Sequence, residues 1–126
     1  SFDDLEGKRS ANTLTSNFGK LAEKAGAQVV AVQGFNESVD LLLSRRVDAT
    51  INDELSFLDF KKQKPDAPLH IVARDTSSEF SESGVLIRKG NPELRQAINA
   101  TLQEMRADGT YKAISEKYFG VDLSAR

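Results

Sequence analysis

The chain alternates between short apolar runs and stretches in which apolar residues recur at helical spacing. Two runs rich in β-branched residues, 28–32 and 47–51, predict buried strands. Apolar residues three or four positions apart predict helices that begin after Ser16, at 34–36, after Asp53, at 91–93 and at Thr110. Further strands are expected at 9–13, 69–73 and 84–90, although the first of these is unusually polar.

This order of strands and helices is the alternation of an α/β fold. We therefore predict a mostly parallel sheet flanked by helices on both faces, followed by C-terminal helices. Ser16 is the expected N-cap of the first helix and Gly26 its expected stop, while Asn91 and Pro92 start a later helix in the usual way.

Composition narrows the class of protein. The 126 residues are enough for one core, and 39% hydrophobic with 29% charged residues is typical of a globular protein rather than a disordered one. A net charge of -2 gives no indication of a nucleic-acid partner, and no apolar run approaches the ~20 residues of a membrane helix. The acidic start, Ser1-Phe2-Asp3-Asp4, is not expected of a signal peptide.

Two strand-to-helix junctions carry the candidate chemistry. Thr15, Ser16 and Asn17 offer hydroxyls, an amide and the free N–H groups of a helix start, a combination that binds anions. Asp53 follows the 47–51 strand and offers a carboxylate to an ammonium group. Because both junctions lie at the carboxyl edge of a parallel sheet, together they would match the two ends of an α-amino acid. The alternative stays open at this point: Ser16 and Asp53 can simply cap their helices.

Five stretches of the chain resemble one family. They are Asp4–Lys8, Thr13–Lys20, Val47–Asp53, Gly84–Asn91 and Asp108–Gly120. They are similar, in this order, to the polar amino-acid periplasmic binding proteins of ABC importers (extracellular solute-binding proteins, family 3). Within that family, the sequences of residues 14–20 and 57–65 resemble the cystine-binding branch most. The resemblance implies a type II periplasmic-binding-protein lobe and a protein that is not an enzyme and carries no cofactor or metal.

The resemblance also implies a set of ligand-binding positions. Ser16 matches the hydroxyl that holds the ligand carboxylate, supported by the N–H of Asn17, and Asp53 matches the carboxylate that holds the α-amino group. Thr15, Phe18 and Gly84 complete the expected ligand-binding set, with Gly84 at the second crossing between lobes. Two residues depart from the family pattern: Ser10 replaces an aliphatic strand residue, and Thr15 replaces a common glycine.

Family members are about twice as long, so we expect this chain to be a C-terminal portion. Residues 1–83 would form the second lobe, and 84–126 would be the returning strand and helices that normally belong to the first lobe. The implied partners are a polar amino acid and the membrane permease of an ABC transporter, and the implied location is periplasmic or lipid-anchored outside the cytoplasm. We expect strand 84–90 to pair within the sheet or, by strand exchange, with a second copy, because an unpaired apolar edge is unstable in water.

The residues also bear on two other classes of protein, an enzyme and a phospho-receiver domain. An enzyme needs a nucleophile or an acid–base pair, but the chain has no cysteine, and its one histidine, His70, has no partner nearby in sequence. The sharper alternative is a phospho-receiver domain with Asp53 as acceptor and Asp3 and Asp4 as the acidic pair. That fold needs the pair at the end of a first apolar strand, and no strand is predicted before Asp3.

Overall fold

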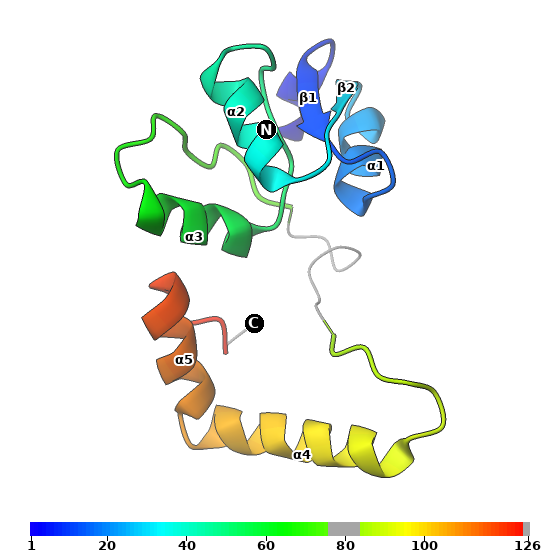
Figure 1. Cartoon of the computed structure of the whole chain (residues 1–126), viewed down its shortest axis with the longest axis vertical. Coiled ribbons are helices and arrows are strands. Elements are labelled where there is room, and N and C mark those ends of the chain that lie inside the picture. The colour runs from blue at the N-terminus through cyan, green and yellow to red at the C-terminus, as the bar shows by residue number, and fades with distance from the viewer. Residues whose placement is uncertain (76–83, 125–126) are drawn as a thin grey trace. The chain divides into compact units, whose positions relative to one another are not determined.

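The computed structural model describes residues 1–75 and 84–124, and the chain divides into two compact units, 1–81 and 82–126. The N-terminal unit contains a 3-10 turn η1 (Phe2–Leu5), two strands and three helices (Figure 1). The C-terminal unit contains two helices. The predicted boundary between residues 83 and 84 adjoins 76–83, which lie outside the described residues, so the assignment of the units to lobes stays a prediction.

The sheet of the N-terminal unit is built on strand β1 (Arg9–Asn12). It pairs in parallel with β2 (Gln28–Ala31), with Arg9 opposite Gln28 and Asn12 opposite Ala31. On its other edge β1 bonds to residues 48–49, where Ser10 and Ala49 form a single parallel bridge. The predicted strand 47–51 is therefore present in its expected place, but it is reduced to one bridged residue.

Helices cover both faces of this sheet, as predicted. Helix α1 (Asn17–Lys24) packs on β1 and β2, and α2 (Phe35–Leu43) packs on β1 from the other side (Figure 1). Helix α3 (Glu54–Gln63) follows the bridged segment. A cluster of Ala11, Val32 and Val47, with Val30, Leu41 and Leu42 packed against it, forms the centre of the apolar core, and Ala22 and Val39 are buried as well.

The polar strand at 9–12 is stable in its buried position because its polar groups bond to one another and to the backbone. Ser10 and Asn12 are 0% and 2% exposed, and they lie on the face opposite Ala11. Ser10 Oγ donates to Asn12 Oδ1 at 2.6 Å, and Asn12 Nδ2 donates to the carbonyl of Ile51 at 2.6 Å. Satisfied polar groups of this kind can be buried at little cost.

The C-terminal unit consists of α4 (Pro92–Ala107) and α5 (Thr110–Phe119), with Gly109 between them in a left-handed conformation at φ 82°. The predicted cap and first-turn proline of α4 are confirmed in position, although the Asn91 amide bonds to the carbonyl of Arg88 instead of to the helix. None of the residues of α4 is buried, and Leu94 of its apolar stripe is half exposed.

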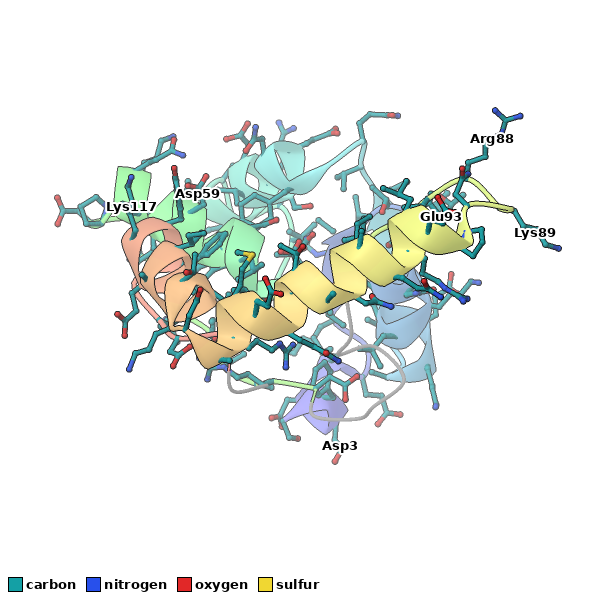
Figure 2. The ribbon with its side chains drawn as sticks, turned by 90° about the horizontal axis from the view of Figure 1, so that it is seen from below. Asp3, Asp59, Arg88, Lys89, Glu93 and Lys117 are labelled. Carbon is teal, nitrogen blue, oxygen red and sulfur yellow. The ribbon has the colours of Figure 1, made fainter. Side chains whose placement is uncertain are left out.

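Two predicted strands are wrong for the described chain. Residues 69–73 and 84–88 have no strand structure, and Leu86 is 98% exposed. The described chain therefore shows no strand there that is paired as predicted, and exchange of 84–90 with a second copy stays a prediction. Figure 2 shows Arg88 and Lys89 projecting away from the ribbon at the start of α4, so the apolar run ends in two exposed cations.

Candidate functional site

Ser16 is the N-cap of α1, as predicted. Its backbone is extended, its Oγ accepts a hydrogen bond from the N–H of Gly19 at 3.1 Å, and the same hydroxyl donates to the carbonyl of Thr13 at 2.8 Å. The hydroxyl has only one proton to donate, and that proton is already bonded to the carbonyl of Thr13. Ser16 therefore acts in the structure as an acceptor for the helix and as a donor to its own loop.

The backbone at the start of α1 offers further donors. The first N–H groups of a helix have no partner within the helix, and in the described chain those of Asn17 and Phe18 have no hydrogen-bond partner elsewhere. Thr15 and Asn17 are exposed, and Phe18 is half-buried. Two N–H groups at the positive end of the helix dipole are thus available to an anion.

Asp53 is the N-cap of α3. One carboxylate oxygen accepts the N–H of Ser56 at 2.8 Å, and the other accepts the Ser56 hydroxyl at 2.7 Å. The residue is exposed and is not buried against a lysine. Each carboxylate oxygen has more than one acceptor position, so the cap does not use up the capacity of Asp53 to accept hydrogen bonds.

The two caps lie at the same edge of the sheet. Ser16 follows the carboxyl end of β1, and Asp53 follows the parallel segment bridged to β1 at Ala49. The bond from Asn12 Nδ2 to the carbonyl of Ile51 joins these two segments close to the points where they leave the sheet. The structure therefore brings Ser16 and Asp53 to neighbouring positions on one rim.

Gly84 belongs to the C-terminal unit. A Cβ added there would meet no atom within 4 Å, so nothing around it in the structure requires glycine. The part of Gly84 in a ligand site stays a prediction.

Sequence reasoning missed the residues that support the two junctions. Thr50 Oγ1 donates to the carbonyl of Ala11 at 2.6 Å and accepts from Asn52 Nδ2 at 3.0 Å. The sequence signal that could have indicated such contacts is the polarity of β1. Ser10 and Asn12 lie at alternate positions of a strand covered by helices, so their side chains must form hydrogen bonds with other groups inside the protein.

A salt bridge between Asp48 and Arg9 lies at the start of strand β1. Asp48 accepts the backbone N–H of Arg9 at 2.9 Å and its guanidinium Nε at 3.4 Å. These two hydrogen bonds, the backbone one first, lower the pKa of Asp48 below its usual value. The pair fixes the entry of β1 beside the segment that leads to Asp53.

A shallow hollow of about 170 Å³ lies between α2 and α3. It is lined by Phe35, Asn36, Ser56, Asp59, Phe60 and Gln63. The rings of Phe35 and Phe60 meet edge to face at 6.0 Å, and Gln63 donates to Asp59 at 2.8 Å. Ser56, which bonds to Asp53, lines this hollow, whereas none of the residues 15–18 does, so the hollow adjoins the Asp53 cap alone.

The described residues do not meet the requirements of a metal site, a histidine-based site or a membrane-spanning helix. Over 1–75 and 84–124, no three histidine, cysteine or acidic side chains are grouped as a metal site would need. His70 is exposed in an irregular segment. Within the same ranges no helix has the length and apolar character that crossing a membrane requires.

Residues 18–121 match the bacterial extracellular solute-binding proteins, family 3. The chain belongs to this family. It is 41% identical to a probable amino-acid ABC transporter-binding protein of Haemophilus influenzae, over 98% of this chain and 48% of that protein. It is 39% identical to the L-cystine-binding protein TcyA of Bacillus subtilis, over 96% of this chain and 44% of that protein.

Solved structures show the same fold. The unliganded, open L-cystine solute receptor of Neisseria gonorrhoeae superposes with a TM-score of 0.80 at 41% identity, covering all of this chain and 53% of that one. An ancestral arginine-binding protein bound to arginine gives a TM-score of 0.74 at 41% identity, covering 94% of this chain and 54% of that one. These likenesses confirm the predicted fold class of a type II periplasmic-binding-protein lobe.

The family membership decides between the classes of protein weighed above. The predicted resemblance is confirmed, and the family is one of solute-binding proteins rather than enzymes. Nothing supports the phospho-receiver alternative: Asp3 and Asp4 lie in the η1 turn before β1, and Asp53 caps a helix. The chain spans about half the length of the curated relatives that it matches.

Proposed function

We propose that this chain supplies one half of a binding site for a polar α-amino acid. The start of α1 takes the ligand carboxylate, and Asp53 takes the α-ammonium group. The observation that carries the proposal is that the two caps follow adjacent parallel segments, joined by the bond from Asn12 to Ile51, and so share one rim of the sheet.

The structure suggests how the carboxylate is held. The N–H groups of Asn17 and Phe18 are the donors ready at the start of α1, whereas the Ser16 hydroxyl donates to Thr13. We propose that the two N–H groups bind first and that the Ser16 hydroxyl then turns, so that it donates its hydrogen bond to the ligand carboxylate instead of to the carbonyl of Thr13. Ser16 can keep its bond from Gly19 throughout, because there it is the acceptor.

The other end of the ligand meets Asp53. An ammonium group donates three hydrogen bonds, and a bond between two charged groups is about twice as strong as a neutral one. Both oxygens of Asp53 are bonded to Ser56, and these two hydrogen bonds fix the orientation of the carboxylate. Thr15 and the ring of Phe18 flank the carboxylate end in this proposal, and Gly84 belongs to the crossing between lobes.

The class of ligand is an amino acid, with a cystine-like molecule as the first candidate. Similar proteins are named for L-cystine, and ancestral arginine-binding proteins similar to this chain were solved with arginine and with glutamine. We further propose that the whole protein works outside the cytoplasm, periplasmic or lipid-anchored, and delivers its amino acid to the permease of an ABC transporter.

Half a site binds weakly, because the ligand stays open to water on one side and its contacts are screened. We expect dissociation constants for the isolated chain near 1 mM, which corresponds to about 4 kcal/mol. Titration of the isotope-labelled chain with L-cystine and L-glutamine, followed by NMR, tests this. We expect the amide signals of Asn17, Phe18 and Ser56 to shift most.

Two blocked ligands identify the two ends of the site. The α-amide of L-glutamine lacks the carboxylate and should no longer shift Asn17 and Phe18. N-acetyl-L-glutamine lacks the ammonium and should no longer shift Ser56. Equal shifts from all three molecules would contradict the proposal, and micromolar binding would contradict the view that the chain holds only half of the site.

Self-association through residues 84–88 is the remaining proposal. The segment carries exposed apolar side chains, and Leu86 is almost fully exposed. Pairing with the same segment of a second copy would remove the apolar side chains of both copies from water.

A further inference from the structure

The ladder of backbone hydrogen bonds between β1 and the segment before Asp53 ends early. Ser10 and Ala49 form one isolated bridge, and the last backbone bond of this pair runs from the N–H of Ala11 to the carbonyl of Ala49 at 2.9 Å. Beyond this point the two segments continue towards Ser16 and Asp53 without further backbone pairing in the described structure. Something other than the ladder must hold them together at the rim.

Two side chains replace the ladder at this position. Asn12 Nδ2 reaches from β1 to the carbonyl of Ile51, and Thr50 Oγ1 reaches back to the carbonyl of Ala11, both at 2.6 Å. Asn12 is 2% exposed, and its side-chain oxygen Oδ1 accepts from Ser10 Oγ while its Nδ2 donates to Ile51, so the side-chain amide cannot turn without losing both hydrogen bonds. The two bonds run in opposite directions and close the gap that the backbone leaves.

We infer that Asn12, supported by Ser10 and Thr50, is a positioning residue that sets the spacing between the two helix caps. Three residues separate Asn12 from Ser16, and one residue separates Ile51 from Asp53. With such short connections, a shift of either segment at the Asn12 bond moves a cap. This inference rests on the proposed function, because spacing matters only if one ligand must reach both caps.

A purely structural role for the buried network is the competing explanation, and one pair of substitutions separates the two. Replacing both partners of a buried hydrogen bond by apolar groups of similar shape is close to neutral for stability. The double variant S10A/N12L therefore removes the link to Ile51 while filling the space of Asn12. Ile51 is only partly buried, so we expect its carbonyl to bond to water instead.

The first readout is binding of L-glutamine to the full chain, measured by NMR titration beside the melting temperature. We expect S10A/N12L to bind about tenfold more weakly than the wild-type chain, with a melting temperature within about 3 °C of it. T50V, which removes the second link, should show a smaller loss of the same kind. Unchanged affinity in both variants would overturn the inference.

Ser38→Ala is the matched control. It removes another buried hydroxyl of the same unit, whose bonds to Gly34 and Ala11 at 3.2 and 3.4 Å are longer, and it leaves both links intact. Its affinity for L-glutamine should equal that of the wild-type chain. If S38A lost as much affinity as S10A/N12L, the loss would follow from removing any buried polar group, and the inference would be overturned.

A ligand-free readout keeps this test separate from the proposed function. Amide hydrogen exchange of Gly19 and Ser56 reports on the caps made by Ser16 and Asp53. We expect S10A/N12L to speed exchange at both amides, whereas S38A does not. If the wild-type chain binds no amino acid, the proposed function fails, while faster exchange at both caps would still support the link; unchanged exchange would overturn it.

Discussion

Gly19 lies directly against the carbonyl of Thr13: a Cβ at residue 19 would be 2.6 Å from that oxygen. The same oxygen accepts the Ser16 hydroxyl, and the N–H of Gly19 donates to Ser16 Oγ. Thr13, Ser16 and Gly19 thus form one closed contact at the start of α1. The loop that presents the proposed carboxylate site packs so closely on residue 19 that any residue larger than glycine would force the loop to move.

Gly19→Ala should therefore destabilise the chain and disturb the loop, even though alanine is the better helix former. Overpacking against backbone usually costs about 1–3 kcal/mol, and thermal unfolding followed by circular dichroism measures it. Gly34→Ala is the matched control, because a Cβ there meets nothing within 4 Å and its backbone is extended. A G19A chain as stable as G34A would contradict the close contact.

Ser16→Asp separates helix capping from anion binding. Aspartate caps a helix as well as serine does but cannot donate to the carbonyl of Thr13, so the melting temperature should fall only by the loss of that one hydrogen bond. Its negative charge opposes the ligand carboxylate, and we expect L-glutamine to bind at least about tenfold more weakly. Gln28→Glu is the control for added charge, because Gln28 is exposed at the amino end of β2 and so lies at the opposite edge of the sheet from the caps. If S16D binds as the wild-type chain does, the carboxylate does not lie at the start of α1.

The Asp48–Arg9 contact predicts part of the acid sensitivity of the fold. Because the pKa of Asp48 is lowered in the folded chain, its contribution to stability is complete above the ordinary value of about 4 and is lost as pH falls through the lower folded value. Asp48→Asn should lower the melting temperature slightly at neutral pH. The difference from the wild-type chain should shrink below about pH 4.

Melting curves between pH 7 and pH 2 measure this difference. The variant should be the less stable chain at the neutral end and should approach the wild-type chain at the acid end. Asp59→Asn, which alters a surface carboxylate of α3 away from Arg9, serves as the control. A difference between D48N and wild type that stays constant over the whole range would contradict a role for the Asp48 charge.

Self-association through 84–88 predicts a dimer that depends on concentration. Light scattering after size exclusion should show it for the wild-type chain, while Leu86→Lys should remain monomeric because a charge in the segment opposes strand pairing. Val72→Lys changes another exposed apolar residue in an irregular segment and should leave the dimer intact. A wild-type chain that is monomeric at every concentration rules this proposal out.

The sequence predicted the helices and their caps well, because these depend on neighbouring residues. Ser16 and Asp53 cap the helices that they were expected to cap, and α4 begins at Pro92. The strands at 69–73 and 84–90 were wrong because β-branched composition alone does not make a strand: a hydrogen-bonded neighbour is also needed, and neither segment has one in the described chain. The Asn12 link could not be predicted, because it joins residues 39 positions apart.

The most direct test of the account is the affinity of Asp53→Asn for L-glutamine. Asparagine caps helices as well as aspartate does, so the variant should melt near the wild-type temperature and keep the bond from Ser56. It lacks the charge that we assign to the ammonium group. The account predicts binding at least about tenfold weaker, with the shift of the Ser56 amide lost; wild-type affinity in D53N would show that Asp53 only caps its helix.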